Sequence, residues 1–295
     1  MNITADTVKQ LRDRTGAGMM ECKRALVETG GDLDAAAEVM RKAGLAKADR
    51  KAERIAAEGM IAAATAADGR VAVLVEVNCE TDFVAREADF AAYVREVAAL
   101  ALERNPGDVA ALMALASAGG QTLEERRRAL IAKIGENITV RRFSRIAGKS
   151  ALGVYLHGTR IGAAVALDSG DAVLAKDLAM HVAASNPQYL DARSVPADQV
   201  AKEREILSAQ AAREGKPPEI IAKMVEGRVR KYLGEITLLG QPFVKDPDLT
   251  VEQLLKKAHG SVGSFARLEV GAGIEKKQEN FAAEVMAQVR GASKS

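Results

Sequence analysis

The fold is decided by the stretch Val71-Ala72-Val73-Leu74-Val75-Glu76-Val77-Asn78, which runs directly into Cys79-Glu80-Thr81-Asp82-Phe83-Val84. Valine at every second position predicts a β-strand with one face against a core, while the other face ends in Glu76 and Asn78. An earlier apolar run, Met60 to Thr65, is separated from this strand by Asp68-Gly69, a dipeptide typical of tight turns. The sequence therefore predicts an antiparallel β-hairpin.

A helix is predicted directly after this hairpin, from about Thr81 to Arg104, because Asn105-Pro106-Gly107 then ends the helical pattern. Another helix opens at Thr122-Leu123-Glu124-Glu125, which has the spacing of a capping box. A further strand is predicted near Ile138 to Ile146. Together these segments form one layer of strands and one of helices.

The chain then partly repeats itself. Leu152 to Leu156 and Ile161 to Leu167 predict a second hairpin around His157-Gly158-Thr159-Arg160, again followed by a helix. The helices resemble each other, since Asp89-Phe90-Ala91-Ala92-Tyr93-Val94 and Asp177-Leu178-Ala179-Met180-His181-Val182 share the Asp, Ala, ring and Val positions. We infer two related subdomains.

The N-terminal segment from Thr4 to about Arg54 predicts three short helices. They are separated at Gly16-Ala17-Gly18 and at Gly30-Gly31, and Asp32 is placed to cap the third. The apolar positions suffice for a small bundle of the size of a binding module. They are Val8, Leu11, Met19, Met20, Leu26, Leu33, Val39 and Met40.

A helical hairpin is predicted from Val195 to about Ile236, turning at Gly215-Lys216-Pro217-Pro218, with arms of roughly 25 Å. Its second arm carries an apolar stripe that must pack against the first arm and is also suited to a protein interface or a dimer contact. The chain then returns through a strand at Phe265 to Val270, and a last helix is expected over roughly Glu279 to Val289.

Composition limits the class of protein. The 295 residues are 48% hydrophobic but only 3% aromatic, with helix formers in long runs, which favours an α+β fold with aliphatic packing. A formal charge of +2 does not suit a dedicated nucleic-acid binder. Cys22 and Cys79 lack disulfide or zinc spacing, and no signal peptide or membrane span is recognisable. We therefore expect a cytoplasmic protein with reduced thiols, without direct nucleic-acid or membrane partners.

Few residues point to enzymatic chemistry. The three histidines, His157, His181 and His259, have no metal-ligand spacing, so no metal site or cofactor is expected. Gly271-Ala272-Gly273 is only a fragment of a glycine-rich loop. The basic runs at Arg126-Arg127-Arg128 and Arg141-Arg142 are more typical of a solvated face than of a binding site. An enzyme is the weaker hypothesis.

The strand-to-helix turn has two interpretations. In the first, Thr81 or Asp82 caps the helix and Phe83 packs into the core. In the second, Phe83 projects as an aromatic anchor for a partner, and Asp82 brings a carboxylate to the same surface. Periodicity does not separate them.

The sequence resembles bacterial elongation factor Ts over essentially its whole length, and the match at the central motif is complete. The segments that carry the resemblance are Thr15-Gly16-Ala17-Gly18-Met19-Met20 with Cys22-Lys23, Glu76-Val77-Asn78-Cys79-Glu80-Thr81-Asp82-Phe83-Val84, Ala132-Lys133-Ile134-Gly135-Glu136-Asn137, His157-Gly158-Thr159-Arg160-Ile161-Gly162, Met180-His181-Val182-Ala183-Ala184-Ser185, Met224-Val225-Glu226-Gly227-Arg228 and Gly240-Gln241-Pro242-Phe243-Val244.

The resemblance implies a domain plan: a three-helix UBA-like partner-binding module, a core of two related α+β subdomains with antiparallel sheets, an inserted antiparallel coiled coil, and a C-terminal helix. The corresponding ranges are 1–54 for the module, 55–149 for the first subdomain, 150–190 with 240–275 for the second, 191–239 for the helical hairpin and 276–295 for the last helix.

The resemblance also implies a function, that of a non-catalytic guanine nucleotide exchange factor for elongation factor Tu in polypeptide elongation, binding it GDP-bound and nucleotide-free. By analogy Phe83 inserts between helices of the GTPase domain and Asp82 disturbs the bound magnesium ion, with Thr81 and Val84 as flanks. Further partner contacts are expected at Met19, Met20, Lys23, Ile134, Gly135, His157 and Val244.

Two other classes of protein stay open. A helical module with an alanine-rich body also suits a general interaction scaffold, which would have no effect on nucleotide release. A small-molecule enzyme would require a deep polar pocket, which the motifs give no reason to expect. Homodimerisation through the helical hairpin is a further expectation that the sequence does not decide.

Overall fold

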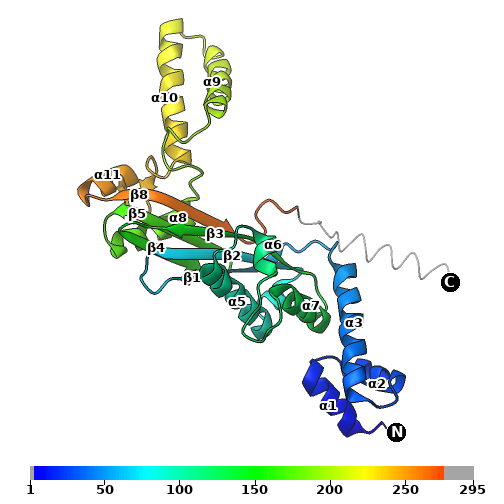
Figure 1. Cartoon of the computed structure of the whole chain (residues 1–295). Helices are drawn as coiled ribbons and strands as arrows, with labels where there is room; N and C mark the ends of the chain where they lie inside the picture. Colours follow the sequence, from blue (N-terminus) through cyan, green and yellow to red (C-terminus); the bar gives the residue numbers. More distant parts are fainter. Residues whose placement is uncertain (1–2, 276–295) are drawn as a thin grey trace, which may run out of the picture.

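The body of the molecule consists of two three-stranded antiparallel sheets packed face to face (Figure 1). This computed structural model describes residues 3–275, apart from the side chains of residues 45–49. The first sheet has the order β1-β2-β3 and the second the order β4-β5-β8. The strands are β1 Glu58–Thr65, β2 Val71–Cys79, β3 Ile138–Ala147, β4 Ala151–His157, β5 Ile161–Ser169 and β8 Ser261–Glu269. The α+β class expected from composition is confirmed.

Helices cover the outer face of each sheet. On the first sheet, apolar side chains of α5 (Ala88–Arg104), α6 (Val109–Met113) and α7 (Leu123–Ile134) form one core with β1, β2 and β3. On the second, α8 (Ala172–Ser185) and α11 (Val251–Lys257) form another. At Gly153 of β4, a Cβ would lie 2.2 Å from the backbone of Ala175, so α8 packs directly on this strand.

A third core lies between the two sheets, and it corrects the prediction for β2. Leu74 of β2 is fully buried against residues of the second sheet such as Ala164 and Leu268, while Val73 and Val75 face the helices. Both faces of the strand are therefore buried. The approach is close, because a Cβ at Gly162 would lie 2.6 Å from Cγ2 of Ile61.

The N-terminal helices form the predicted small bundle, with α1 Ala5–Thr15, α2 Met19–Glu28 and α3 Leu33–Lys51. Asp32 caps α3, because its Oδ1 accepts hydrogen bonds from the N–H groups of Asp34 and Ala35 at 2.8 and 3.0 Å. The core contains Val8, Leu11, Cys22, Ala25, Leu26 and Ala36. Met19 and Met20, predicted among the core positions, are exposed instead.

The bundle is joined to the body where α3 reaches the end of α7. Lys51 Nζ donates a hydrogen bond to the carbonyl oxygen of Gly135. The amide of Asn137 donates to the carbonyl oxygens of Ala52 and Arg54, at 3.3 and 2.7 Å. The segment that leaves the bundle is therefore hydrogen-bonded to the loop between α7 and β3.

A pair of helices, α9 (Ala197–Ala212) and α10 (Pro218–Ile236), projects from the end of the body opposite the bundle (Figure 1). Gly215, with φ of 66°, lies in the turn between them. Val225 and Val229 of α10 are buried against α9, whereas Ile220, part of the same predicted stripe, is 47% exposed.

Some elements differ from the prediction. The helix expected from Thr81 to Arg104 is two helices, α4 (Asp82–Ala85) and α5, because Glu87 has extended backbone angles (φ −65°, ψ 136°). Three short elements were not predicted besides α6: β6 (Pro242–Phe243), β7 (Asp246–Thr250) and α11. The helix expected at 279–289 lies outside the described residues.

Candidate functional site

The turn that follows β2, residues 80–86, presents the central sequence motif at one edge of the body. Thr81 is the N-cap of α4, since its Oγ1 accepts a hydrogen bond from the N–H of Val84 at 3.4 Å. The helix is a single turn, closed by hydrogen bonds from Ala85 and Arg86 N–H to Thr81 and Phe83 carbonyl oxygens. This geometry places Asp82 and Phe83 at the very start of a helix.

Phe83 points into solvent. Its exposure is 77%, the highest among the large hydrophobic side chains of the described residues, whereas its neighbour Val84 is 7% exposed and packs into the core of the first sheet. Val84 thus occupies the core position that one interpretation gave to Phe83. That interpretation is wrong for Phe83 and correct for the Thr81 cap. An aromatic ring held outside the core suits an anchor for a partner protein.

Asp82 lies beside Phe83, with its side chain half exposed. Its carboxylate forms an ion pair with Arg86 Nη2 at 2.8 Å, one helical turn further on. An exposed pair of this kind contributes only about 0.5 kcal/mol, so the carboxylate can change partners at little cost. Asp82 is therefore available to a positive centre on a docked protein.

The 80–86 turn is held by the loop between α7 and β3. Oε2 of Glu136 accepts hydrogen bonds from Glu80 and Thr81 N–H at 3.1 and 3.0 Å, and its Oε1 accepts one from Thr81 Oγ1 at 2.7 Å. In return, Oε1 of Glu80 accepts a hydrogen bond from Asn137 N–H at 2.6 Å. Sequence reasoning did not find this contact.

Ile134 and Gly135 lie at the end of α7, directly before Glu136. Gly135 is the C-cap, with φ of 90° in the left-handed region that favours glycine, and both residues are partly buried. The structure therefore brings these two predicted contacts close to the 80–86 turn through Glu136.

The cysteine that ends β2 is buried beneath the 80–86 turn. Cys79 is fully buried, and its Sγ donates to the carbonyl oxygen of Thr81 at 3.2 Å. Burial, with the nearby carboxylates of Glu136 and Glu58, raises the pKa of this thiol to about 12. It stays protonated near neutral pH and supports the turn.

A second group of predicted contacts lies on α2. Met19 and Met20 are 44% and 69% exposed, and Lys23 is exposed beside them. Val27, one turn beyond Lys23, is 61% exposed and was not predicted, although its spacing places it on the same helix face. These four side chains form an apolar patch with one positive charge.

His157 and Val244 belong to the second sheet and its surroundings. His157 ends β4, is exposed, and its Nδ1 lies 3.1 Å from the hydroxyl of Tyr155. Val244 follows β6 and is 45% exposed. The predicted contacts thus occupy several surface regions rather than one pocket, which is typical of a macromolecular interface.

Comparison with known proteins gives one family. The family model described as Elongation factor TS matches residues 80–272. Proteins named Elongation factor Ts are 60% identical in Thioalkalivibrio sulfidiphilus (strain HL-EbGR7), over 99% of this chain and 100% of that protein, and 60% identical in Methylococcus capsulatus (strain ATCC 33009 / NCIMB 11132 / Bath), over 98% and 99%. One from Legionella pneumophila (strain Paris) is 54% identical, over 98% of this chain and 99% of that protein.

This chain belongs to the elongation factor Ts family. The resemblance read from the sequence segments is confirmed. The matched region begins at Glu80, the first residue of the 80–86 turn, and the relatives extend the similarity through the N-terminal bundle.

A buried histidine supports the Val244 region of this elongation factor Ts family member. His181 of α8 is fully buried, its Nδ1 accepts a hydrogen bond from Val244 N–H at 3.2 Å, and its Nε2 lies 3.0 Å from Oε1 of Gln241. The ring therefore donates from Nε2 and is neutral. Burial lowers its pKa, although the contact with Gln241 opposes this shift. The Met180-His181 segment of the family resemblance was the signal that could have found it.

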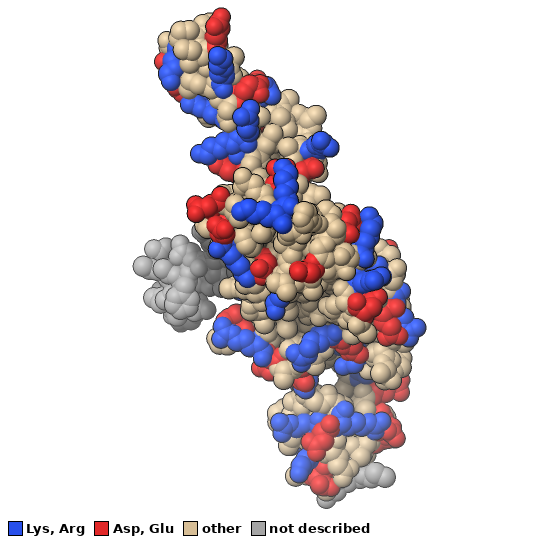
Figure 2. All heavy atoms as spheres, turned by 90° about the vertical axis from the view of Figure 1, so that its left-hand side faces the viewer, with Lys and Arg blue, Asp and Glu red and all other residues tan. Residues whose placement is uncertain are grey.

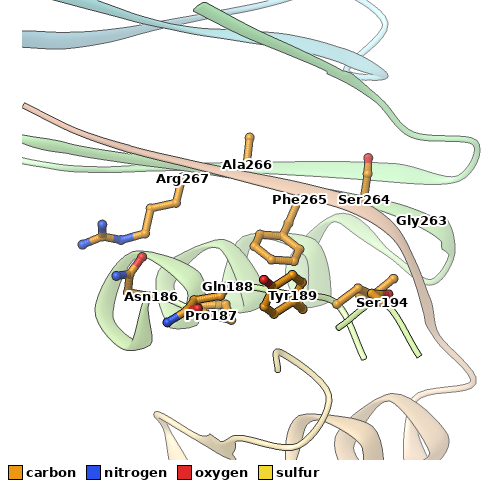
Figure 3. A pocket seen from close by; sticks show the side chains of 11 residues that line it. Asn186, Pro187, Gln188, Tyr189, Ser194, Gly263, Ser264, Phe265, Ala266 and Arg267 are labelled. Carbon is orange, nitrogen blue, oxygen red and sulfur yellow. The ribbon is translucent and has the colours of Figure 1, made fainter. Parts of the chain in front are cut away.

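Two open grooves lie on the described part of the chain. One, of about 510 Å³, lies between β8 and the segment after α8, where Phe265 points toward Tyr189 (Figure 3). Its lining holds Arg267 but no carboxylate, histidine, lysine or cysteine, so it offers no acid and base pair. The other, of about 690 Å³, lies along α9 and α10.

The basic runs of the sequence are paired with carboxylates. Arg126 lies 2.6 Å from Glu96, Arg127 and Arg128 both contact Glu124, and Arg141 and Arg142 both contact Glu76. Figure 2 shows acidic and basic side chains intermixed over the face in view.

The part of the chain that the structure describes holds no group of three or more His, Cys, Asp or Glu side chains placed to bind a metal ion. Over residues 3–275, no helix is both long enough and apolar enough to cross a membrane.

Proposed function

We propose that this chain is a guanine nucleotide exchange factor for elongation factor Tu in polypeptide elongation, acting in the cytoplasm. The exposed Phe83 on the hydrogen-bonded 80–86 turn carries the proposal, and membership of the elongation factor Ts family supports elongation factor Tu as the partner. The chain would bind the GDP-bound and the nucleotide-free partner, and would perform no covalent chemistry itself.

The energy needed for exchange is within reach of one side chain. Complete burial of a phenylalanine in a partner contributes about 1.5–3 kcal/mol, and each 1.4 kcal/mol or so corresponds to a tenfold change in affinity. Because Phe83 is held outside the core before binding, little of this energy is spent on reorganising the chain. Insertion of the ring between helices of the GTPase domain can thus stabilise a distorted nucleotide site.

Asp82 would act on the magnesium ion of the partner. Magnesium bridges the nucleotide phosphates and requires a near-octahedral oxygen shell, so a carboxylate that disturbs this shell weakens GDP binding. The coupling is reciprocal: GDP must lower the affinity for the exchange factor by the same factor by which the exchange factor lowers that for GDP. GTP can then enter and release the factor.

The remaining predicted contacts would set affinity and orientation. The bundle of residues 1–54, proposed to be UBA-like, would bring the Met19, Met20 and Lys23 patch to the GTPase domain, together with the first subdomain of residues 55–149. The second subdomain, residues 150–190 and 240–275, would contact another domain of the partner through His157 and Val244. The arm of residues 191–239 is the proposed coiled coil and place of homodimer contact, and residues 276–295 the proposed C-terminal helix.

The test is the rate of GDP release from elongation factor Tu, followed by stopped flow with a fluorescent GDP. Phe83→Ala and Asp82→Ala should each slow release by tenfold or more, roughly the effect of losing an interface anchor. Val173→Ala is the matched control, since Val173 is 70% exposed and is also the second residue of its helix. Wild-type rates in both site variants, at unchanged circular dichroism, would refute the proposal.

A further inference from the structure

A carboxylate outside the central motif is hydrogen-bonded to the 80–86 turn. Glu136 accepts three hydrogen bonds from it: the Glu80 and Thr81 N–H groups on Oε2, at 3.1 and 3.0 Å, and the Thr81 hydroxyl on Oε1, at 2.7 Å. The acceptor is a carboxylate, and hydrogen bonds to a charged acceptor are in general stronger than neutral ones. They fix the two residues immediately before Asp82 and Phe83.

Each of the two loops, the 80–86 turn and the loop between α7 and β3, donates hydrogen bonds to the other. While Glu136 accepts from the 80–86 turn, Glu80 Oε1 accepts from the N–H of Asn137 at 2.6 Å. The left-handed conformation of Gly135 ends α7 and turns the chain so that residues 136 and 137 both face the turn. Two loops that lie about 55 residues apart in sequence are therefore clamped at both ends.

The Thr81 hydroxyl links this clamp to the start of α4. Because its proton is donated to Glu136, its lone pairs are directed to the N–H of Val84, which it caps at 3.4 Å. Removal of the Glu136 side chain would allow this hydroxyl to rotate and the cap to loosen. The direction of Phe83, two residues beyond the cap, depends on that geometry.

We propose that Glu136 is a positioning residue for nucleotide exchange: it fixes the direction in which Asp82 and Phe83 leave the turn. The inference rests on the proposed exchange function. Glu136 acts through the turn, so its loss lowers the maximal rate of GDP release more than it raises the KM for elongation factor Tu.

Two conservative substitutions distinguish the effect of the length of the Glu136 side chain from the effect of its charge. Glu136→Gln keeps the length of the side chain, so its carbonyl oxygen can accept from both N–H groups while its amide donates to Thr81 Oγ1. Glu136→Asp keeps the charge but withdraws the carboxylate by one methylene. If Glu136 positions the turn, the glutamine variant retains most of the maximal rate and the aspartate variant loses it.

The experiment measures the maximal rate and KM of GDP release for Glu136→Ala, Glu136→Asp and Glu136→Gln, each in the wild-type and in the Phe83→Ala chain. We expect the alanine and aspartate variants to lower the maximal rate by roughly tenfold, and much less in the Phe83→Ala chain, because the two residues act on one step. Equal losses in both chains, or a glutamine variant slower than the aspartate variant, would overturn the positioning role.

Separate measurements test whether the variants fold and whether the proposed exchange function is correct. Circular dichroism and thermal unfolding report whether each variant folds, and the glutamine and aspartate pair decides the question if the alanine variant does not. If Phe83→Ala slows release and the Glu136 variants do not, only the positioning role is wrong. If Phe83→Ala has no effect, the exchange function itself is wrong, and the positioning role falls with it.

Discussion

Both halves of the body contain a β-hairpin followed by a capped helix, but they differ in the residues around the start of that helix. In the first half, β1 and β2 form a hairpin and Thr81 caps α4; in the second half, β4 and β5 form a hairpin and Asp171 caps α8. The second residue of each helix is exposed and apolar, Phe83 at 77% and Val173 at 70%. The scaffold that presents a side chain to solvent is therefore present twice.

The halves differ in what surrounds that position. Helix α8 continues from its cap to Ser185 without a break, whereas α4 stops after Ala85 and the chain restarts as α5. The residue before the cap is Gly170 in the second half and Glu80 in the first, where the turn is clamped by Glu136. The first half thus differs from the second by a helix break, an exposed aromatic ring and a carboxylate that clamps the turn.

The largest expected effect concerns a buried charge in the first half. Glu76 of β2 is fully buried and pairs with Arg141 and Arg142 at 3.0 and 2.6 Å, while the inward position Ala166 of β5 is apolar. Burial would raise the pKa of Glu76, but the Gly271 N–H and the two arginines outweigh it and hold the pKa below its ordinary value.

We expect Glu76→Ala to lower the free energy of unfolding by about 2–3 kcal/mol, because the partners lose their acceptor. Urea denaturation followed by circular dichroism measures it. Glu252→Ala, which removes an exposed pair with Lys256, is the control and should change stability by less than about 0.5 kcal/mol. The Glu76 contribution is present above the ordinary glutamate pKa and is lost as pH falls below it. Equal effects of the two substitutions would contradict this account.

A smaller effect concerns the polar rings that are buried on the covering helices, Tyr93 on α5 and His181 on α8. Tyr93 of α5 donates its hydroxyl to the carbonyl oxygen of Leu123 at 3.2 Å, and His181 of α8 is buried neutral. Because burial lowers the pKa of His181, the unfolded chain takes up a proton that the folded chain does not as pH falls below the ordinary histidine pKa.

Stability should therefore fall as the pH is lowered from about 7.5 to about 5.5, with a slope of at most about 1.4 kcal/mol per pH unit from this residue. Denaturation of the wild type and of His181→Gln at both pH values measures it. The wild type should lose more stability on acidification than His181→Gln does. A variant with an unchanged pH dependence would show that His181 is not the titrating group.

The smallest expected effect concerns the N-caps of the two helices, Thr81 of α4 and Asp171 of α8. Thr81→Ala and Asp171→Ala should each destabilise the protein by about 1 kcal/mol, since each removes the acceptor for an N–H of its helix. Only Thr81→Ala should also slow GDP release, because its hydroxyl is bound to Glu136. Thermal unfolding and the stopped-flow assay measure the two effects, and slower release by Asp171→Ala would remove the distinction between the halves.

Local patterns predicted most of the fold. The hairpin around Asp68-Gly69 forms with Gly69 at φ of 67°, and the capping box at Thr122 and Glu125 is present. These features depend on residues a few positions apart, which a sequence displays directly. The cap of the helix after β2 is likewise a local feature, and the sequence offered Thr81 or Asp82 for it; the structure has Thr81.

The features that the sequence did not predict depend on contacts between residues that are far apart in the sequence. No glycine or proline marks the break at Arg86 and Glu87, where good helix formers still favour a continuous helix. The second buried face of β2 meets strands that occur some 80 to 190 residues later. The Glu136 clamp likewise joins residues 55 apart, and the exposure of Phe83 follows from Val84 filling the core.

The hydrogen bonds of Lys51 and Asn137 have a consequence for association. They tie the end of the N-terminal bundle to the loop that also holds the 80–86 turn. In the proposed complex, docking of the patch on α2 would make the binding of the Phe83 ring intramolecular, at an effective concentration set by this hydrogen-bonded joint. Two weak contacts held in this way behave as one bivalent ligand.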